Sequence, residues 1–270
     1  MIQVESFSSP LVKRADRGAV AVLTLASPQT RNALSLDMID ALIEAFEGVG
    51  EDPGVRAIVL TGEGPALSAG HDLKELQAHR NDPDQGRAFF EHEMDRCAEL
   101  MQNIVALGKP VIAAVEGVAT AAGCQLVASC DLAVAGAKAR FALPGVNIGL
   151  FCSTPLVAVG RSISRKHAME MALTGDFVDA ERAEQIGLVN RVAPEGGALE
   201  LAVQLAQKIA SKSAATIAFG KPTFYRQLET PLDEAYEIAG TTMVENLEHE
   251  DAREGFAAFL EKRPPNWGHE

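Results

Sequence analysis

Two stretches of very small residues in this chain have the composition of a site for a negatively charged oxygen. The first runs from Gly117 to Gly123 and contains only glycine, valine, alanine and threonine, and the second collects Ala66, Ser68, Ala69 and Gly70. Because no bulky side chain covers the backbone there, N–H groups at the start of a following helix stay free to bind an oxygen. Small residues are equally expected where a helix merely packs closely on a sheet.

Each stretch lies between a predicted strand and a predicted helix. The apolar run Val111–Val115 predicts a buried strand before the first stretch, and Cys124–Cys130 predicts a buried helix after it. Val55–Thr61 predicts a strand before the second, which belongs to a loop over Gly62–Leu76 where Asp72 is suited to cap a short helix. At both places the helix dipole would favour negative charge.

The turns Ser68–His71 and Ala121–Gly123 would form an oxyanion hole if they converged. Such a hole is a pair of fixed N–H donors aimed at a carbonyl oxygen that becomes negative during reaction. Losing one donor typically costs about 3–4 kcal/mol of transition-state stabilisation. Convergence is an assumption at this stage, because sequence spacing does not establish it.

A few side chains near these turns could take part in chemistry. His71 could act as a base near neutral pH, or could contribute only its N–H. Cys152 could act as a nucleophile only if its pKa were lowered, and no cationic residue adjoins it in the sequence. We expect Glu116 to hold a loop and Asp131 to form a structural hydrogen bond.

Composition and patterning bound the class of protein. The formal net charge of −13 argues against nucleic-acid partners. No basic, apolar leader opens the chain, and no apolar run approaches the roughly 20 residues that span a bilayer. We therefore expect no membrane partner. We expect a cytoplasmic location, or the mitochondrial matrix for a mature eukaryotic chain. The four cysteines lack metal-binding spacing, so no metal is expected.

Strands dominate the first half of the chain and helices the end, which predicts an α/β fold with a helical C-terminal extension. We place the core at residues 1–200 and the extension at residues 201–270. The apolar stripes of the extension would cover either its own core or a neighbouring subunit.

Five phrases, in this order, resemble the crotonase (enoyl-CoA hydratase/isomerase) superfamily: PQTRNALS, TGEGPALSAGHDLKEL, VEGVATAAGCQLVASCD, PGVNIGLF and FLEKRPPNW. The match runs over nearly the whole chain, from about Val20 to Trp267. The text from Ala119 to Ser153 resembles the subgroup named enoyl-CoA hydratase domain-containing protein 3.

The resemblance implies a crotonase (ClpP-like) fold, in which a spiral of ββα repeats carries a C-terminal helical trimerisation region, assembled as a homotrimer or a dimer of trimers. It implies an acyl-CoA substrate, so that coenzyme A arrives as part of the thioester and no cofactor is held permanently. By motif position the N–H donors are those of His71 and Ala122. The positions matching coenzyme A contacts are Arg31, Ala33, Leu34, Ser68, Ala69, Asp72, Leu73 and, toward a neighbouring subunit, Phe259 and Lys262.

The chain departs from the hydratase pattern at both catalytic glutamates of the family. Gln125 stands at the first position and Gly145 at the second. Glutamine cannot take a proton and glycine has no side chain, so the usual acid/base pair is absent. Asn147 and Ser153 match positions where some isomerases and hydrolases of the superfamily carry acids, and neither is a useful base at neutral pH.

We therefore expect a protein of acyl-CoA or fatty-acid metabolism, nominally an enoyl-CoA hydratase, whose hydratase turnover is in question. An isomerase, decarboxylase or thioesterase of the same superfamily is one alternative, and a non-catalytic acyl-CoA-binding protein is another. A serine or cysteine hydrolase that uses Ser153 or Cys152 would be unrelated, and the sequence lacks its nucleophile elbow.

Overall fold

The core of the computed structural model, which describes residues 10–268, is a six-stranded sheet. Its strand order is β1-β2-β3-β5-β7-β10, and every neighbouring pair is parallel except β1 and β2, which form an antiparallel hairpin. The strands are β1 (Val12–Arg17), β2 (Val20–Leu25), β3 (Ala57–Gly62), β5 (Val111–Val115), β7 (Leu132–Gly136) and β10 (Arg191–Ala193).

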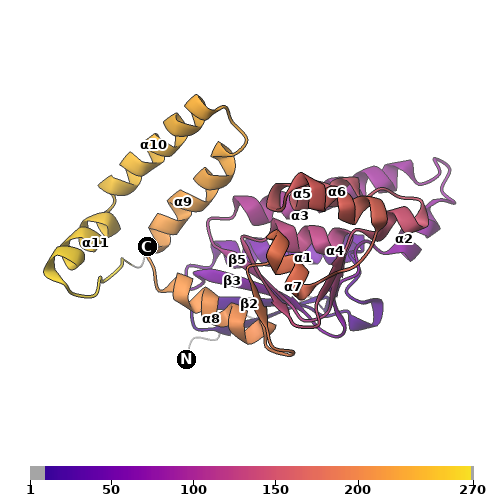
Figure 1. Cartoon of the computed structure of the whole chain (residues 1–270), viewed down its shortest axis with the longest axis horizontal. Coiled ribbons are helices and arrows are strands. Elements are labelled where there is room, and N and C mark those ends of the chain that lie inside the picture. The colour runs from indigo at the N-terminus through magenta and orange to yellow at the C-terminus, as the bar shows by residue number, and fades with distance from the viewer. Residues whose placement is uncertain (1–9, 269–270) are drawn as a thin grey trace.

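Helices cover both faces of this sheet, which explains why its strands read as continuous apolar runs. Alternate residues such as Leu23 and Leu25 pack in a cluster with α1 (Leu36–Glu51) and α3 (Arg87–Ala106). Val20 and Val22 point the other way, into a second cluster with α8 (Ala198–Ala210). In Figure 1 the sheet lies between α8 and the helices α1, α3 and α4.

A smaller four-stranded sheet, of order β4-β6-β8-β9, carries the small-residue turns. The segment expected as one loop from Gly62 to Leu76 contains the strand β4 (Ala66–Ser68), and the first small-residue stretch contains β6 (Val118–Thr120). Those two expectations were wrong because each strand is only three residues long and is held by its neighbours rather than by local propensity. The sheet is completed by β8 (Arg140–Ala142) and β9 (Val178–Asp179).

Shorter helices connect these strands, and their starts follow the capping residues in the sequence. Ser35 caps α1 by accepting from the Met38 N–H, and Asp72 caps α2 by accepting from the Lys74 and Glu75 N–H groups. The connecting helices are α2 (Leu73–His79), α4 (Ala122–Ser129), α5 (Ser153–Ser162), α6 (Arg165–Thr174) and α7 (Ala180–Ile186), with 3-10 turns η1 (Pro28–Thr30) and η2 (Pro144–Ile148).

Three C-terminal helices, α9 (Ala214–Gln227), α10 (Leu232–Glu248) and α11 (Glu250–Glu261), form an arm that extends away from the core (Figure 1). Lys221 of α9 anchors the arm, because its Nζ donates to the Ile104 and Lys109 carbonyls and pairs with Asp131 at 2.8 Å. Ten large apolar side chains of the arm are exposed: Phe224, Leu228, Leu232, Tyr236, Met243, Val244, Leu247, Phe256, Phe259 and Leu260.

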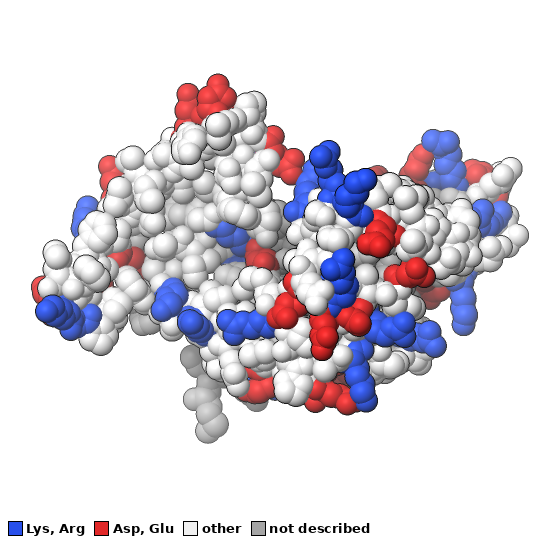
Figure 2. All heavy atoms as spheres, in the orientation of Figure 1, with Lys and Arg blue, Asp and Glu red and all other residues white. Residues whose placement is uncertain are grey.

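In the view of Figure 2, acidic and basic side chains are interspersed over the surface of the core, whereas much of the surface between the arm and the core is uncharged. No helix in the described part of the chain is both long enough and apolar enough to cross a membrane.

Candidate functional site

The structure brings the two small-residue turns together. The strands that lead into them, β4 and β6, are parallel neighbours, so the turns that follow lie at the same edge of the small sheet. A Cβ atom on Gly123 would lie 2.2 Å from the Ser68 carbonyl oxygen, and one on Gly70 would lie 2.9 Å from the Ala121 Cβ. Glycine is therefore required at both positions, because the backbones of the turns are in direct contact.

Two backbone N–H groups are free at this junction. Among the hydrogen bonds of residues 10–268, neither the His71 N–H nor the Ala122 N–H has an acceptor. Ala122 is the first residue of α4, where an N–H has no partner within the helix. Ala121 before it has a φ of 50°, a backbone conformation that sets the direction of the turn. The arrangement presents two donors and the positive end of one helix dipole.

A third segment, which contains several of the predicted coenzyme A positions, lies beside the second turn. The Ala69 N–H donates to the Arg31 carbonyl, the Leu34 N–H donates to the Gly70 carbonyl, and Leu34 forms a parallel bridge with His71. Arg31 and Leu73 are exposed, Ala33, Ala69 and Asp72 are half-buried, and Leu34 and Ser68 are buried. The predicted positions in the core thus form one contiguous rim beside the His71 N–H.

The other two predicted coenzyme A positions lie elsewhere in the chain. Phe259 is on α11 and Lys262 follows it, at the end of the molecule opposite α2 in Figure 1. The Phe259 side chain is 82% exposed. Within one chain these residues lie away from the turns, and their contact with the coenzyme A of a neighbouring subunit stays a prediction.

Glu93 on α3 is a site residue that the sequence analysis missed. Its carboxylate lies 3.1 Å from the His71 Nδ1, and its side chain is fully buried. Glu93 shares the buried face of α3 with Cys97, Leu100 and Ile104. Glu93 occupies an apolar position in the helical repeat of α3, and this is the signal that could have identified it as a site residue, because buried acids need a partner.

The protonation of His71 follows from this pairing. Burial lowers the pKa of His71, but the neighbouring Cys97 thiol group and Glu93 carboxylate raise it by more, so that the pKa rises to about 10. The imidazole is therefore an imidazolium at neutral pH. A general base must be unprotonated at the working pH, so the structure argues against the base role considered for this side chain.

Gln125 and Gly145, the two positions at which the resemblance predicts glutamates to be missing, are both buried. Gln125 is one turn into α4, 4% exposed, and its Oε1 has no hydrogen-bond partner in the described structure. A Cβ on Gly145 would lie 2.7 Å from the Leu150 carbonyl oxygen and 2.9 Å from the Cys152 Sγ. The space beside Gly145 is thus already filled by the chain that follows it.

The remaining candidates are not brought into a nucleophilic arrangement. Burial raises the pKa of Cys152, so its thiol is not activated. The Ser153 Oγ bonds only the Phe151 carbonyl, at 3.4 Å, and no histidine in residues 10–268 is bonded to it. Glu116 accepts from the Gly196 and Ala198 N–H groups, which confirms its predicted role in holding a loop.

Asp131 accepts from the Val111 N–H at 2.7 Å and from the Tyr225 hydroxyl at 3.0 Å. Its predicted role as a structural hydrogen-bond partner is confirmed.

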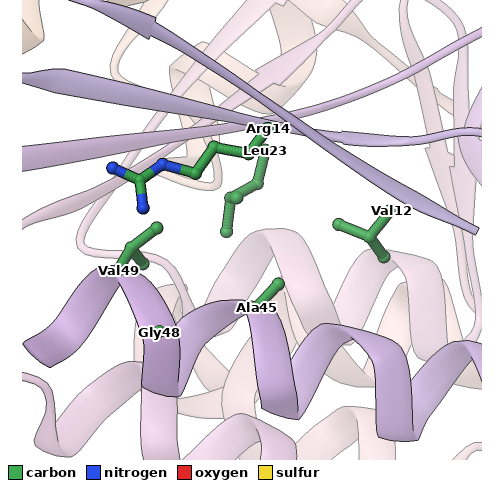
Figure 3. Close-up of a pocket in the computed structure, with 6 residues that line it drawn as sticks. All are labelled: Val12, Arg14, Leu23, Ala45, Gly48 and Val49. Carbon is green, nitrogen blue, oxygen red and sulfur yellow. The ribbon is translucent and has the colours of Figure 1, made fainter. Parts of the chain in front are cut away.

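A separate small cavity lies between the hairpin and α1. It measures about 10 Å³ and is lined by Val12, Arg14, Leu23, Ala45, Gly48 and Val49 (Figure 3). A space of this size holds at most one water molecule, so it is not a candidate substrate site.

Comparisons with known proteins agree with the geometry. The family described as Enoyl-CoA hydratase/isomerase matches residues 15–270. The chain is 47% identical to the mitochondrial enoyl-CoA hydratase domain-containing protein 3 of Rattus norvegicus, over 92% of this chain and 81% of that protein. The Homo sapiens protein of the same name is 46% identical, over 92% of this chain and 80% of that protein.

Solved structures give the same result for the fold. An enoyl-CoA hydratase from Mycobacterium smegmatis aligns with a TM-score of 0.90 and 50% identity, over 96% of this chain and 99% of that one. Human enoyl-CoA hydratase domain-containing protein 3 aligns with a TM-score of 0.90 and 43% identity, over 95% of this chain and all of that one. The predicted crotonase fold is confirmed, and the chain belongs to the enoyl-CoA hydratase/isomerase family, in its enoyl-CoA hydratase domain-containing protein 3 subgroup.

Proposed function

We propose that this protein binds an acyl-CoA thioester and holds the thioester oxygen between the backbone N–H groups of His71 and Ala122. The observation that carries the proposal is the convergence of two turns whose N–H groups have no acceptor in the described chain. Fixed backbone donors are suited to an oxygen that gains negative charge, because they need no reorganisation as the charge develops. Coenzyme A would lie along the rim formed by Arg31, Leu34 and Ser68.

The reaction would proceed through an enolate-like thioester, and it would not rely on the glutamate pair of the hydratases. Gln125 cannot exchange a proton, and Gly145 offers no side chain. The proposed role is therefore acyl-CoA chemistry in which enolate stabilisation is the main contribution of the protein. Hydration of an enoyl thioester would be slow or absent.

Thioester binding tests the first part of the proposal. Ala122→Pro removes one N–H at the first position of a helix, where proline is tolerated. We expect weaker binding of butyryl-CoA, measured by calorimetry, and a loss of turnover of about a hundredfold or more. Ala214→Pro, at the first position of α9, is the matched control and should leave binding unchanged. Equal affinity in a folded Ala122→Pro variant would refute the assignment of the donors.

Hydration of crotonyl-CoA tests the second part. The native protein should be inactive or slow when the loss of enoyl-thioester absorbance is followed, and Gln125→Glu should raise the rate. A fast native protein would show that a base outside the two glutamate positions acts on water.

We also propose that the exposed apolar side chains of the arm pack against other copies of the chain, as a homotrimer or a dimer of trimers. The eukaryotic relatives carry the word mitochondrial in their names, which supports the matrix as the location of a eukaryotic protein of this subgroup. Sedimentation of the native protein would give the number of copies.

A further inference from the structure

Glu93 and His71 form a buried ion pair that stability alone does not explain. The Glu93 side chain is 0% exposed and that of His71 is 14% exposed, and the Glu93 Oε1 lies 3.1 Å from the His71 Nδ1. The other oxygen of Glu93 and the Nε2 of His71 have no hydrogen-bond partner within residues 10–268. Apolar residues of the same volume often stabilise a protein as well as a buried ion pair does, or better. The pair therefore needs an explanation in what it holds in place.

The residue that supplies one of the two free N–H groups has little regular structure around it. His71 lies between the strand β4 and the helix α2, and it is joined to Leu34 by an isolated bridge. Gly70 before it has a φ of 89°, a backbone conformation that glycine adopts readily and other residues rarely do. The direction of the His71 N–H thus depends on the contacts that restrain the peptide between Gly70 and His71.

Two contacts restrain this peptide. The Gly70 carbonyl accepts from the Leu34 N–H at 2.8 Å. Because the peptide is planar and trans, the His71 N–H points to the opposite side from that carbonyl. A single hydrogen bond leaves the peptide plane free to tilt about it. The second restraint is the imidazole ring, which joins the Cα of His71 to the carboxylate of Glu93.

The helix that carries Glu93 also contacts the element that supplies the other N–H group. α3 packs against α4, whose first residue is Ala122. A Cβ on Gly70 would lie 3.2 Å from the Ala122 nitrogen, so the two donor segments are close neighbours. Leu100, on the same face of α3 as Glu93, is fully buried in the core. α3 is therefore one well-anchored helix in contact with the residues or elements that carry both N–H groups.

We propose that Glu93 is a positioning residue, which acts through the His71 ring on the backbone N–H of His71. The carboxylate holds the ring at Nδ1, the ring holds its own Cα, and the separation of the His71 and Ala122 N–H groups is set from one helix. No proton is transferred in this role, and neither side chain needs to touch the thioester. The inference rests on the proposed function, because the separation matters only if both N–H groups bind one oxygen.

The vibration of the thioester carbonyl tests the inference, because each hydrogen bond to a carbonyl oxygen lowers its stretching frequency. Butyryl-CoA would be bound to the full chain with ¹²C or ¹³C at the carbonyl, and the infrared difference would separate this band from the protein bands. In the native protein we expect the band below that of free butyryl-CoA. In Glu93→Leu the band should move back toward the free value, and the affinity should fall about two- to tenfold, which corresponds to one hydrogen bond.

Three further variants separate positioning from a general structural role. Glu93→Gln keeps a hydrogen-bonding group for Nδ1 and should retain the native band. Glu91→Leu makes the same change as Glu93→Leu at an exposed glutamate of α3 that pairs with Arg87, and it should also retain the native band.

The double variant His71→Ala, Glu93→Leu removes the ring and the buried charge together and keeps both N–H groups. It should show the band of Glu93→Leu, because Glu93 acts only through the ring and the two changes are then not additive. It also serves as the test variant should Glu93→Leu alone fail to fold.

The outcomes are distinct. A native protein that does not bind butyryl-CoA, or that leaves its carbonyl band at the free position, would overturn the proposed function and this inference with it. A lowered native band that is unchanged in folded Glu93→Leu would overturn the inference alone, even if that variant has a lower melting temperature. A double variant whose band differs from that of Glu93→Leu would overturn the path through the ring.

Discussion

A single methyl group at Gly123 should separate the two turns of the candidate site. The added Cβ would lie 2.2 Å from the Ser68 carbonyl oxygen and 2.9 Å from the Ser68 Cβ. Neither atom can rotate away, because Ser68 ends the strand β4 and is paired with β6. Relief of the contact requires the turns to move apart by about 1 Å, since non-bonded carbon and oxygen atoms need more than 3 Å.

The magnitude follows from two opposing effects. Alanine is favoured over glycine within a helix by about 1 kcal/mol, and Gly123 is the second residue of α4. Overpacking in a buried site typically destabilises by about 1–3 kcal/mol. We expect Gly123→Ala to lower the free energy of unfolding by up to about 2 kcal/mol. A displacement of about 1 Å in a positioned site lowers binding or turnover by about a hundredfold.

Chemical denaturation and calorimetric titration with butyryl-CoA would measure both effects. Gly48→Ala is the matched control, because Gly48 lies in α1, is exposed, and has no atom within 4 Å of an added Cβ. That substitution should stabilise the protein by about 1 kcal/mol and leave the affinity unchanged. A Gly123→Ala variant that is as stable as Gly48→Ala, or that binds the thioester with native affinity, would contradict a close contact between the two turns.

The folded-state pKa of His71, about 10, lies above its usual value, so the contribution of His71 to stability is complete below about pH 6.5 and is lost as the pH rises toward 10. Urea titrations should show the free energy of unfolding falling over that range by at most about 1.4 kcal/mol per pH unit. The fall should be smaller in Glu93→Gln. Ala121→Gly should raise the melting temperature, because the φ of 50° at Ala121 is strained for alanine and such a strained residue costs about 1–3 kcal/mol. A lower melting temperature in this variant would contradict the strain at Ala121. Lys221→Met should cost about 3 kcal/mol by urea denaturation, because it leaves Asp131 without its buried cation, and a loss below about 1 kcal/mol would show that the ion pair does not anchor the arm.

The sequence was sufficient for features that depend on neighbours along the chain. The strand Val111–Val115 has the predicted bounds, and Asp72 caps a short helix as predicted. These signals are local, since apolar runs and capping oxygens act within one or two turns. The short strand β4 was missed because three small residues have no recognisable pattern, and it exists only through pairing with β6.

Contacts between distant segments could not be predicted in the same way. His71 and Glu93 are 22 residues apart, and their pairing depends on how α3 crosses the second turn. Convergence of the two turns likewise had to be assumed, because it results from strand order in the small sheet. The apolar periodicity of α3 did contain a usable signal, because Glu93 interrupts the face that Cys97 continues.

The two predicted glutamate positions differ in whether they could accept a glutamate side chain, which restricts how hydratase activity could be introduced. At Gly145 the added side chain of a glutamate would start 2.7 Å from the Leu150 carbonyl oxygen and 2.9 Å from the Cys152 Sγ, so backbone movement would be needed to admit it. Gln125 meets no such obstacle, because glutamate has nearly the same shape. Gln125→Glu therefore introduces a buried carboxylate without a steric obstacle, whereas Gly145→Glu also requires the loop to move. If the loop is rigid, Gly145→Glu should be destabilised, and any gain in hydration would come from Gln125→Glu alone.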